Sequence, residues 1–191
     1  MTNVPAPKAS TALRTELLLV TFLIILDVVA RLLPHAPNFT PIAASTLFAA
    51  VVLQRRSLAL LVPLIAMPVS DLLIGPDDWR ITAVVYGSML LPFAAGLVAR
   101  NHRLSRSVAP AILSCSLLFF ATTNFAVWAF SGMYSHDMAG LIACYVAALP
   151  FLKHTVAGDL FWSVALFGGA FLLRRWQERN QEQPATLASQ V

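Results

Sequence analysis

Apolar runs close to the length of a membrane-spanning helix make up most of this chain. A helix rises about 1.5 Å per residue, so about 20 apolar residues cross the ~30 Å hydrocarbon core of a bilayer. Six runs approach that length, at residues 17–34, 39–53, 57–74, 81–99, 107–130 and 155–173. The pattern therefore predicts an all-α membrane protein, a bundle of six transmembrane helices.

Composition supports a membrane protein over a soluble or nucleic-acid-binding one. Hydrophobic residues make up 58% of the chain and charged residues only 12%, whereas soluble domains average about 25% charged residues. The mean hydropathy is +0.74. The net charge of +4 comes from basic residues confined to connections between the apolar runs, which is typical of membrane topology. We expect contact with membrane lipid and no nucleic-acid partner.

The basic residues also predict which way the chain is oriented. Cytoplasmic connections of membrane proteins carry an excess of Lys and Arg. With the N-terminus inside, the cytoplasmic side holds Lys8, Arg14, Arg55, Arg56, Arg100, Arg103, Arg106, Arg174, Arg175 and Arg179. Only Arg31, Arg80 and Lys153 of the 13 basic residues then lie outside. We predict that both termini are cytoplasmic, with disordered tails at 1–16 and 176–191.

One apolar segment does not fit the spanning pattern. Residues 138–151, "MAGLIACYVAALPF", end near a proline and are too short to cross a bilayer. We predict a short interfacial or re-entrant helix on the outer side. It either covers a cavity or packs on the bundle, and the sequence leaves both alternatives open.

Polar side chains gather on the predicted outer side of the membrane. Polar residues within membrane segments generally face the bundle interior or a water-filled cavity and mark ligand pathways. We therefore predict an outward-facing pocket. Its candidate ligand-binding residues are Arg31, His35, Asn38, Asp71, Tyr86, Asn124, Trp128 and Asp159.

Several of these residues also have structural explanations. Asp27 and Arg31 are four residues apart and so share a helical face, where pairing offsets the ~2.5–3.5 kcal/mol cost of a charge inside the membrane. Alternatively, Arg31 turns into the cavity and contacts an anionic group of a ligand. Asp71 and Asp159 either accept hydrogen bonds from the ligand, or orient helix ends and pair with Arg31 or Lys153.

The remaining candidates have two alternatives each. His35 either serves the ligand as a donor or metal ligand, or is an interfacial residue in water. Asn124 either lines the pocket or makes a hydrogen bond between helices. Tyr86 and Trp128 would supply flat apolar contact.

Enzyme motifs are missing from the sequence. It has no phosphate-cradling G-x-x-x-x-G-K-[ST] loop, no His-Glu-x-x-His zinc pattern and no G-x-S-x-G nucleophile setting. We expect no enzymatic activity, no catalytic residues and no covalently bound cofactor. The alternative enzyme hypothesis uses Asp71 and Asp159 as an acid/base pair, which works only when their environments separate the two pKa values.

A set of motifs resembles a known family. They are "RLLPHAPNFTPIAA", "LVPLIAMPVSDLLIG", "TNFAVW", "LIACYVAALPFLKHTVAGDLFW" and "ALFGG". Together they resemble a group of small bacterial inner-membrane proteins. That group is similar in turn to the S components of energy-coupling-factor (ECF) vitamin transporters, closest to the solitary cobalamin-uptake protein BtuM. The resemblance covers residues 14–175.

The resemblance implies a six-helix bundle that binds a vitamin from outside, with cobalamin as the first expectation. It implies either docking on a coupling subunit driven by two ATPases, or solitary action. His35, Asp71 and Tyr86 are the pocket residues it implies. The alternative class is a structural or assembly protein of the cell envelope.

Two departures from the family pattern bear on this. The first apolar run has only Thr21 and Ala30 as small residues, so the usual docking face for a coupling subunit is missing. The outer stretch at 75–86 lacks the cysteine that binds cobalt in the cobalamin branch. Cobalt would then be bound by His35 or Cys144, or not at all.

Overall fold

The structure, a computed structural model, describes residues 9–75, 78–100 and 104–188. Within these ranges it consists of helices and connections, with no β-strand. The helices are α1 (Ala9–Leu32), α2 (Ile42–Val52), α3 (Arg56–Ile74), α4 (Trp79–Ser88), α5 (Leu90–Arg100), α6 (Leu104–Phe130) and α7 (Met138–Ala188). The predicted all-α class is confirmed.

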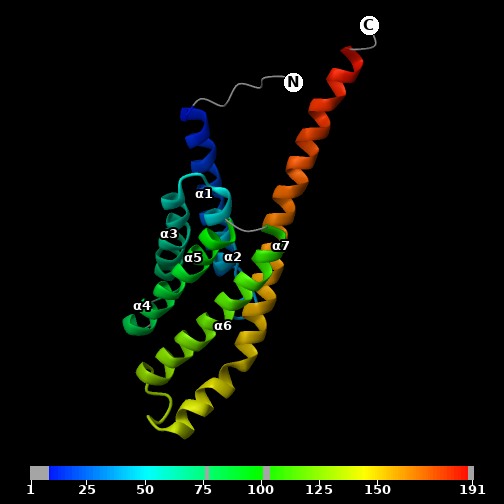
Figure 1. Ribbon diagram of the computed structural model, residues 1–191. Helices are drawn as coiled ribbons and strands as arrows, with labels where there is room; N and C mark the ends of the chain where they lie inside the picture. The colour runs from blue at the N-terminus through cyan, green and yellow to red at the C-terminus, as the bar shows by residue number, and fades with distance from the viewer. Residues whose placement is uncertain (1–8, 76–77, 101–103, 189–191) are drawn as a thin grey trace.

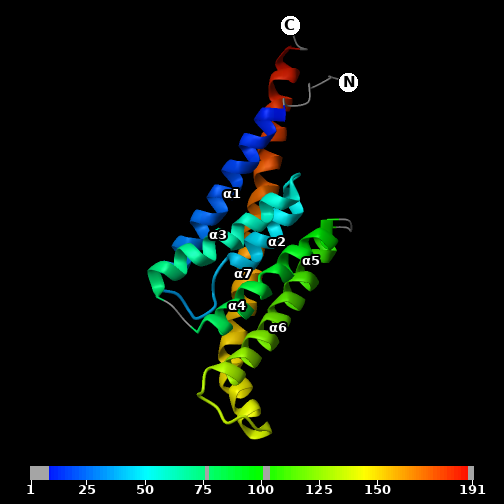
Figure 2. The ribbon, with the colours of Figure 1, turned by 90° about the vertical axis from the view of Figure 1, so that its left-hand side faces the viewer.

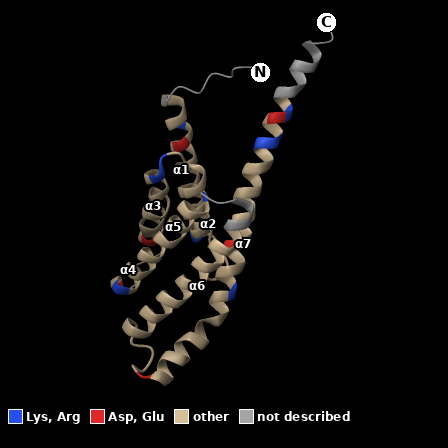
Figure 3. Cartoon of the chain, viewed as in Figure 1, with Lys and Arg blue, Asp and Glu red and all other residues tan. Residues whose placement is uncertain are grey.

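The helices run up and down between two ends of the molecule. α1 begins and α7 ends at one end, which we call the tail end (Figures 1 and 2). The connection 131–137 between α6 and α7 lies at the opposite end, which we call the hairpin end (Figure 1). Charged residues are sparse along the described helices (Figure 3). A low density of charge suits a bundle that spans a membrane.

Four segments are long and apolar enough to cross a membrane by themselves, counting the described residues only. They are Arg56–Ile74, Trp79–Arg100, Val108–Phe130 and Met138–Asn180. The second of these joins α4 and α5, which meet at Met89. Pro92 follows three residues later and cannot donate a backbone hydrogen bond, which accounts for a break there.

The first two predicted spans differ from the other four. α1 has 24 residues but carries Arg14, Glu16, Asp27 and Arg31. α2 has 11 residues, so it is about 16 Å long and cannot cross a bilayer alone. Nine of its residues are buried, because α2 lies inside the bundle among α1, α3, α5 and α7. The run at 39–53 is therefore a core helix.

α7 is one continuous helix of 51 residues. The sequence predicted an interfacial helix at 138–151, a separate span at 155–173 and a disordered tail from 176; the structure instead gives a single helix from Met138 to Ala188. Pro150 does not end it, because a proline in a membrane helix can kink the helix while neighbouring groups satisfy the freed carbonyl. Figure 1 shows the helix bending in its yellow part.

The start of the chain also differs from the prediction. α1 begins at Ala9 rather than near residue 17, so half of the predicted tail 1–16 is helical. The part of that tail at 1–8 lies outside the described residues.

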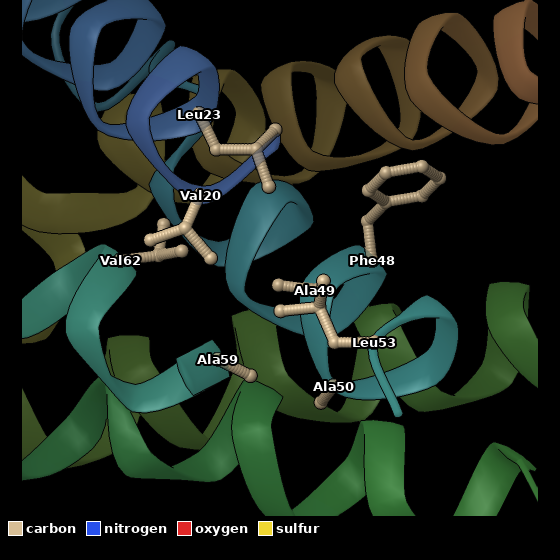
Figure 4. Packing of buried hydrophobic residues seen from close by; sticks show 8 residues of the cluster. All are labelled: Val20, Leu23, Phe48, Ala49, Ala50, Leu53, Ala59 and Val62. Carbon is tan, nitrogen blue, oxygen red and sulfur yellow. The ribbon is translucent and has the colours of Figure 1, made fainter. Parts of the chain in front are cut away.

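The hydrophobic core joins the first three helices. Its cluster is made of Val20, Leu23, Phe48, Ala49, Ala50, Leu53, Ala59 and Val62 (Figure 4). At the tail end, Glu16 fixes the α2–α3 turn by accepting from the Gln54 amide at 2.7 Å and the Arg55 guanidinium at 2.8 Å. These contacts hold α1 against α2 and α3.

A close approach of α5 to α2 depends on a glycine. A Cβ at Gly96 would lie 2.6 Å from the Ala50 Cβ and 2.8 Å from the Leu47 carbonyl oxygen. Small residues of this kind let membrane helices pack backbone to backbone. The contact fixes α2 at the centre of the bundle, where its first turn forms one wall of the site described next.

Candidate functional site

A cavity of about 350 Å³ lies between the α1–α2 connection and the middle of the bundle. Four predicted site residues line it: Arg31, His35, Asn38 and Asp159. His35 and Asn38 are exposed, whereas Asp159 is only 4% exposed. The cavity thus runs from the exposed α1–α2 connection into the bundle, and its volume is in the range of about 300–1,000 Å³ found for small-molecule sites.

Arg31 reaches this cavity from the last turn of α1. Its Nη2 donates to Asp71 Oδ1 at 2.6 Å and its Nη1 lies 2.7 Å from Met67 Sδ. Asp71 Oδ2 in turn accepts from the Tyr86 hydroxyl at 2.7 Å. Arg31 therefore pairs with Asp71 of α3 instead of Asp27, and it also lines the cavity. Asp71 and Tyr86 are not among the residues that line the cavity, and they position Arg31 there.

Asp27 pairs with Ser45 and not with Arg31, the residue four positions later that shares its helical face. It is completely buried, and Ser45 Oγ lies 2.8 Å and 2.7 Å from its two carboxyl oxygens. This contact joins α1 to α2. Asp27 is not one of the residues that line the cavity.

His35 is held in one tautomer by its own backbone. Its Nδ1 lies 2.6 Å from the Leu33 carbonyl oxygen, which can only accept, so Nδ1 carries the hydrogen. In the neutral ring Nε2 then keeps its lone pair. His35 is therefore an acceptor or a potential metal ligand at the mouth of the cavity. Asn38, with φ of 62°, is a residue type that tolerates this left-handed conformation.

Asp159 forms the inner end of the cavity. Its Oδ2 accepts from Ser116 Oγ of α6 at 2.6 Å. α7 comes close to the α1–α2 connection here because Gly158 has no side chain: a Cβ would lie 3.0 Å from Phe39 Cα. Lys153, the other predicted partner, makes no ion pair with Asp159 among the described residues.

Several residues at this site were not predicted from the sequence. Cys115, Thr155 and Met67 also line the cavity, and Ser116 bonds to Asp159. Thr155 could have been found, because it precedes Asp159 by four residues and so shares its helical face. The other three had no comparable signal, since Ser, Cys and Met are common in helices that merely pack.

Two predicted site residues lie elsewhere. The Asn124 amide donates to the Phe120 carbonyl oxygen of its own helix at 2.8 Å. The Trp128 indole N–H donates to the Ser135 carbonyl oxygen at 2.9 Å. Neither is among the residues that line the cavity. Both belong to the end of α6 and its connection to α7, because α6 extends past the cavity towards the hairpin end.

Comparison with known proteins places the chain in a family. A model described as "Family of unknown function (DUF6580)" matches residues 11–183. The chain belongs to this family. The matched range includes every residue that lines the cavity, so the site lies within the family's domain. No curated protein and no solved structure matches the chain.

In this DUF6580 chain, the two predicted cobalt ligands occupy different places. His35 lies at the mouth of the cavity. Cys144 is buried against α6, with its Sγ 3.4 Å from the Asn124 carbonyl oxygen, and does not line the cavity. In the described part of the chain, no three His, Cys, Asp or Glu residues are grouped to hold a metal ion. Of the two predicted cobalt ligands, His35 alone lines the cavity and could meet a metal brought in by a bound molecule.

Proposed function

We propose that this protein binds a small vitamin-like molecule on the outer side of the bacterial inner membrane and takes it up. The observation that carries the proposal is the cavity lined by Arg31, His35, Asn38 and Asp159. It combines a polar mouth with a buried carboxyl group inside an apolar bundle, which is typical of a ligand pathway. The distribution of basic residues favours cytoplasmic termini and a hairpin end outside, with α2 as a short pass buried between the longer helices.

The hydrogen-bonding groups in the cavity favour one kind of ligand. Ser88 Oγ donates to the Val84 carbonyl oxygen at 2.8 Å and Thr155 Oγ1 to the Phe151 carbonyl oxygen at 2.9 Å. A hydroxyl has one hydrogen, so the Thr155 hydroxyl is left as an acceptor towards the cavity, while Ser88 Oγ also lies 3.0 Å from Thr122 Oγ1. Asp159 and His35 Nε2 are acceptors as well. The interior therefore suits a ligand that presents N–H or O–H donors.

The mouth and the walls complete this description. Arg31 offers a cation where the ligand's anionic or carbonyl group would lie. Ile42, Met89 and Phe119 supply apolar wall. An amino-substituted heterocycle with an acidic or carbonyl substituent meets all three requirements, and several vitamins are of this type.

The size of the cavity bears on the expectation of cobalamin. A volume of about 350 Å³ is at the lower end of the range for drug-sized ligands, and a corrin with its side chains is much larger. We therefore put a smaller nitrogen heterocycle first. Cobalamin would require the α1–α2 connection to move outward, and His35 is then its candidate cobalt ligand.

We propose solitary action rather than docking on an ATPase-driven coupling subunit. The face that α1 exposes is bulky, with Leu18, Phe22 and Ile25 more than half exposed. Close docking between membrane helices favours small residues, whereas bulky apolar side chains suit contact with lipid. The alternative function is that of a structural or assembly protein of the envelope. It is favoured only by the internal partners of Asp71 and Asp159, and it does not explain the cavity.

Ligand binding by purified protein tests the proposal. Protein in lipid nanodiscs is titrated calorimetrically with thiamine, pyridoxine, biotin, riboflavin and cobalamin, and its small-molecule content is analysed by mass spectrometry. We expect saturable binding of at least one compound, weakened at least tenfold in Asp159→Asn and His35→Gln. His136→Gln is the matched control, because His136 is another exposed loop histidine at the hairpin end and packs on Trp128 outside the cavity. Absence of any bound or co-purified molecule would favour the scaffold.

A further inference from the structure

Beside Asp159, two oxygen atoms lie within hydrogen-bond distance of one serine hydroxyl, which has only one hydrogen to donate. Ser116 Oγ lies 2.6 Å from Asp159 Oδ2 and 3.0 Å from the Ile112 carbonyl oxygen. Both neighbours are acceptors when Asp159 is ionised, and a serine hydroxyl has a single hydrogen to donate. One of the two contacts is then left without a hydrogen. If Asp159 carries a proton, it donates to Ser116 Oγ while Ser116 donates to Ile112, and both contacts are hydrogen bonds.

No cation supplies an alternative. The ion pairs in the described part of the chain are Arg31–Asp71, Arg55–Glu16 and Arg80–Asp78. The titratable groups that line the same cavity are Arg31 and His35 from the α1–α2 side and Cys115 from α6. From α2, α3, α4 and α5 only uncharged residues line it. Arg31 is already paired with Asp71, and a buried carboxylate without a partner charge is costly.

We propose that Asp159 and Ser116 form an exchangeable proton-binding site that is reached through the cavity. When a proton enters from water at the mouth, it binds the Asp159 carboxylate, and the Ser116 hydrogen turns from Asp159 to the Ile112 carbonyl oxygen. When the proton leaves, the hydroxyl turns back. No bond other than the O–H bond of the carboxyl group forms or breaks. The site goes beyond the proposed uptake function and does not depend on which molecule is taken up.

A second aspartate provides an internal comparison. Ser45 Oγ lies within 2.8 Å of both carboxyl oxygens of Asp27 and 3.2 Å from the Ile42 carbonyl oxygen. This pair has the same shortage of hydrogens. Asp27 is completely buried and does not line the cavity, so a proton on it has no comparable route to water. The two carboxyl groups should differ in exchange rate, and cavity access is the reason.

Infrared difference spectroscopy of the protein in lipid films tests the proposal directly. The carbonyl stretch of a protonated carboxyl group is separate from that of a carboxylate, and it shifts when the proton is replaced by deuterium. We expect a carboxylic acid band that is absent from Asp159→Asn, shifts promptly in D₂O, and disappears as the pH of the bathing buffer is raised. A second band, absent from Asp27→Asn, should exchange more slowly.

Further variants guard against misfolding. Ser116→Ala should shift the Asp159 band, because its hydrogen-bond partner is removed while the carboxyl group stays. If Asp159→Asn does not fold, as judged by circular dichroism, Asp159→Glu should move the band rather than abolish it. The proposal is overturned if no band depends on Asp159, or if the band responds neither to pH nor to D₂O. A negative vitamin screen would overturn the uptake function and leave this result standing.

Discussion

At the scale of single residues, Arg31 reaches the cavity because Asp71 of α3 holds its guanidinium and Tyr86 of α4 holds Asp71. Replacing Tyr86 by Phe keeps the ring and removes only the hydrogen bond to Asp71 Oδ2. We expect a loss of about 1 kcal/mol in the free energy of unfolding, the usual net contribution of such a bond. Thermal unfolding in detergent measures it.

The control for this change is Tyr134→Phe. The Tyr134 hydroxyl has no hydrogen-bond partner among the described residues, so the same chemical change should leave stability unaltered. An equal effect of both substitutions would show that the Tyr86 bond to Asp71 contributes nothing.

Ligand binding should depend on pH through Asp159. A ligand that donates an N–H to this carboxyl group needs its ionised form, so binding competes with the proton. Where Asp159 is protonated in the free protein, affinity should rise as pH rises, by up to about tenfold per pH unit. Calorimetric titration of a vitamin that binds, from pH 5 to pH 8, measures this, with Asp159→Asn expected to be flat. An affinity that falls with rising pH in the unaltered protein would contradict the prediction that the ligand donates a hydrogen bond to the Asp159 carboxylate.

At the candidate site, the sequence could identify the strongly polar residues and could not identify the small hydroxyl, thiol and apolar residues beside them. Arg31, His35, Asn38 and Asp159 stood out because polar residues in apolar surroundings have few reasons to be there. Asn124 and Trp128 met the same criterion and lie elsewhere, because depth in the membrane does not tell which way a helix face points. Ser116 was missed because a serine in a helix often bonds only to its own backbone.

At the scale of helices, the α2–α5 contact depends on the missing side chain of Gly96. Gly96→Ala places a methyl group within 2.6 Å of the Ala50 Cβ. The helices must separate, and we expect a cost of about 1–3 kcal/mol in the free energy of unfolding, typical of overpacking. Unfolding of the purified variant measures it.

Gly168→Ala in α7 is the matched control, because a Cβ there has no neighbouring atom within 4 Å. Alanine favours helix over glycine by up to about 1 kcal/mol. Stability should therefore stay the same or increase. If both substitutions lowered the free energy of unfolding, the change from glycine to alanine itself, and not the α2–α5 contact, would be the cause.

The start of α7 is fixed by Asp137. Its Oδ1 accepts from the Gly140 amide at 2.7 Å and from Ser135 Oγ at 2.9 Å, which is an N-cap arrangement. The hydrogen bond from the Gly140 amide, together with that from Ser135, holds the pKa of this carboxyl group below its usual range.

The lowered pKa predicts an acid-sensitive helix start. The stabilisation is complete at pH values above the ordinary carboxyl pKa of about 4, and it is lost as pH falls through the lower pKa of the folded state. The protection of the amide hydrogens at residues 138–141, relative to their intrinsic exchange rates at each pH, should therefore decrease on acidification below pH 4. In Asp137→Ala this protection should be low at neutral pH already and change less with acidification.

At the scale of the whole molecule, the two ends of the bundle should face opposite sides of the membrane. In a background without Cys115 and Cys144, Met133→Cys places a thiol at the exposed hairpin end, and Ser57→Cys places one at the exposed tail end. A membrane-impermeant maleimide should label the first in intact cells and the second only after the cells are permeabilised. The opposite pattern would invert the orientation and place the cavity mouth in the cytoplasm.

The sequence predicted the all-α class, because long apolar runs have few alternatives in a membrane. The prediction was wrong where the length of an apolar run does not determine how the run is placed in the bundle. The run at 39–53 predicts a span, and in the structure it is the short core helix α2, surrounded by other helices. The run at 138–151 predicts an interfacial helix that ends near Pro150, and in the structure the helix continues through this proline. Only contacts between helices, absent from a linear pattern, distinguish these cases.

The unbroken course of α7 has a mechanical consequence. With 51 residues it is about 75 Å long, far more than the ~30 Å of a hydrocarbon core. It links the hairpin end, Asp159 at the cavity and the Arg174–Arg175 pair towards the tail end. Beyond the bend in its first part, the helix continues without a break from Asp159 past Arg175. We therefore expect a ligand that shifts Asp159 to move the tail end of α7 as well.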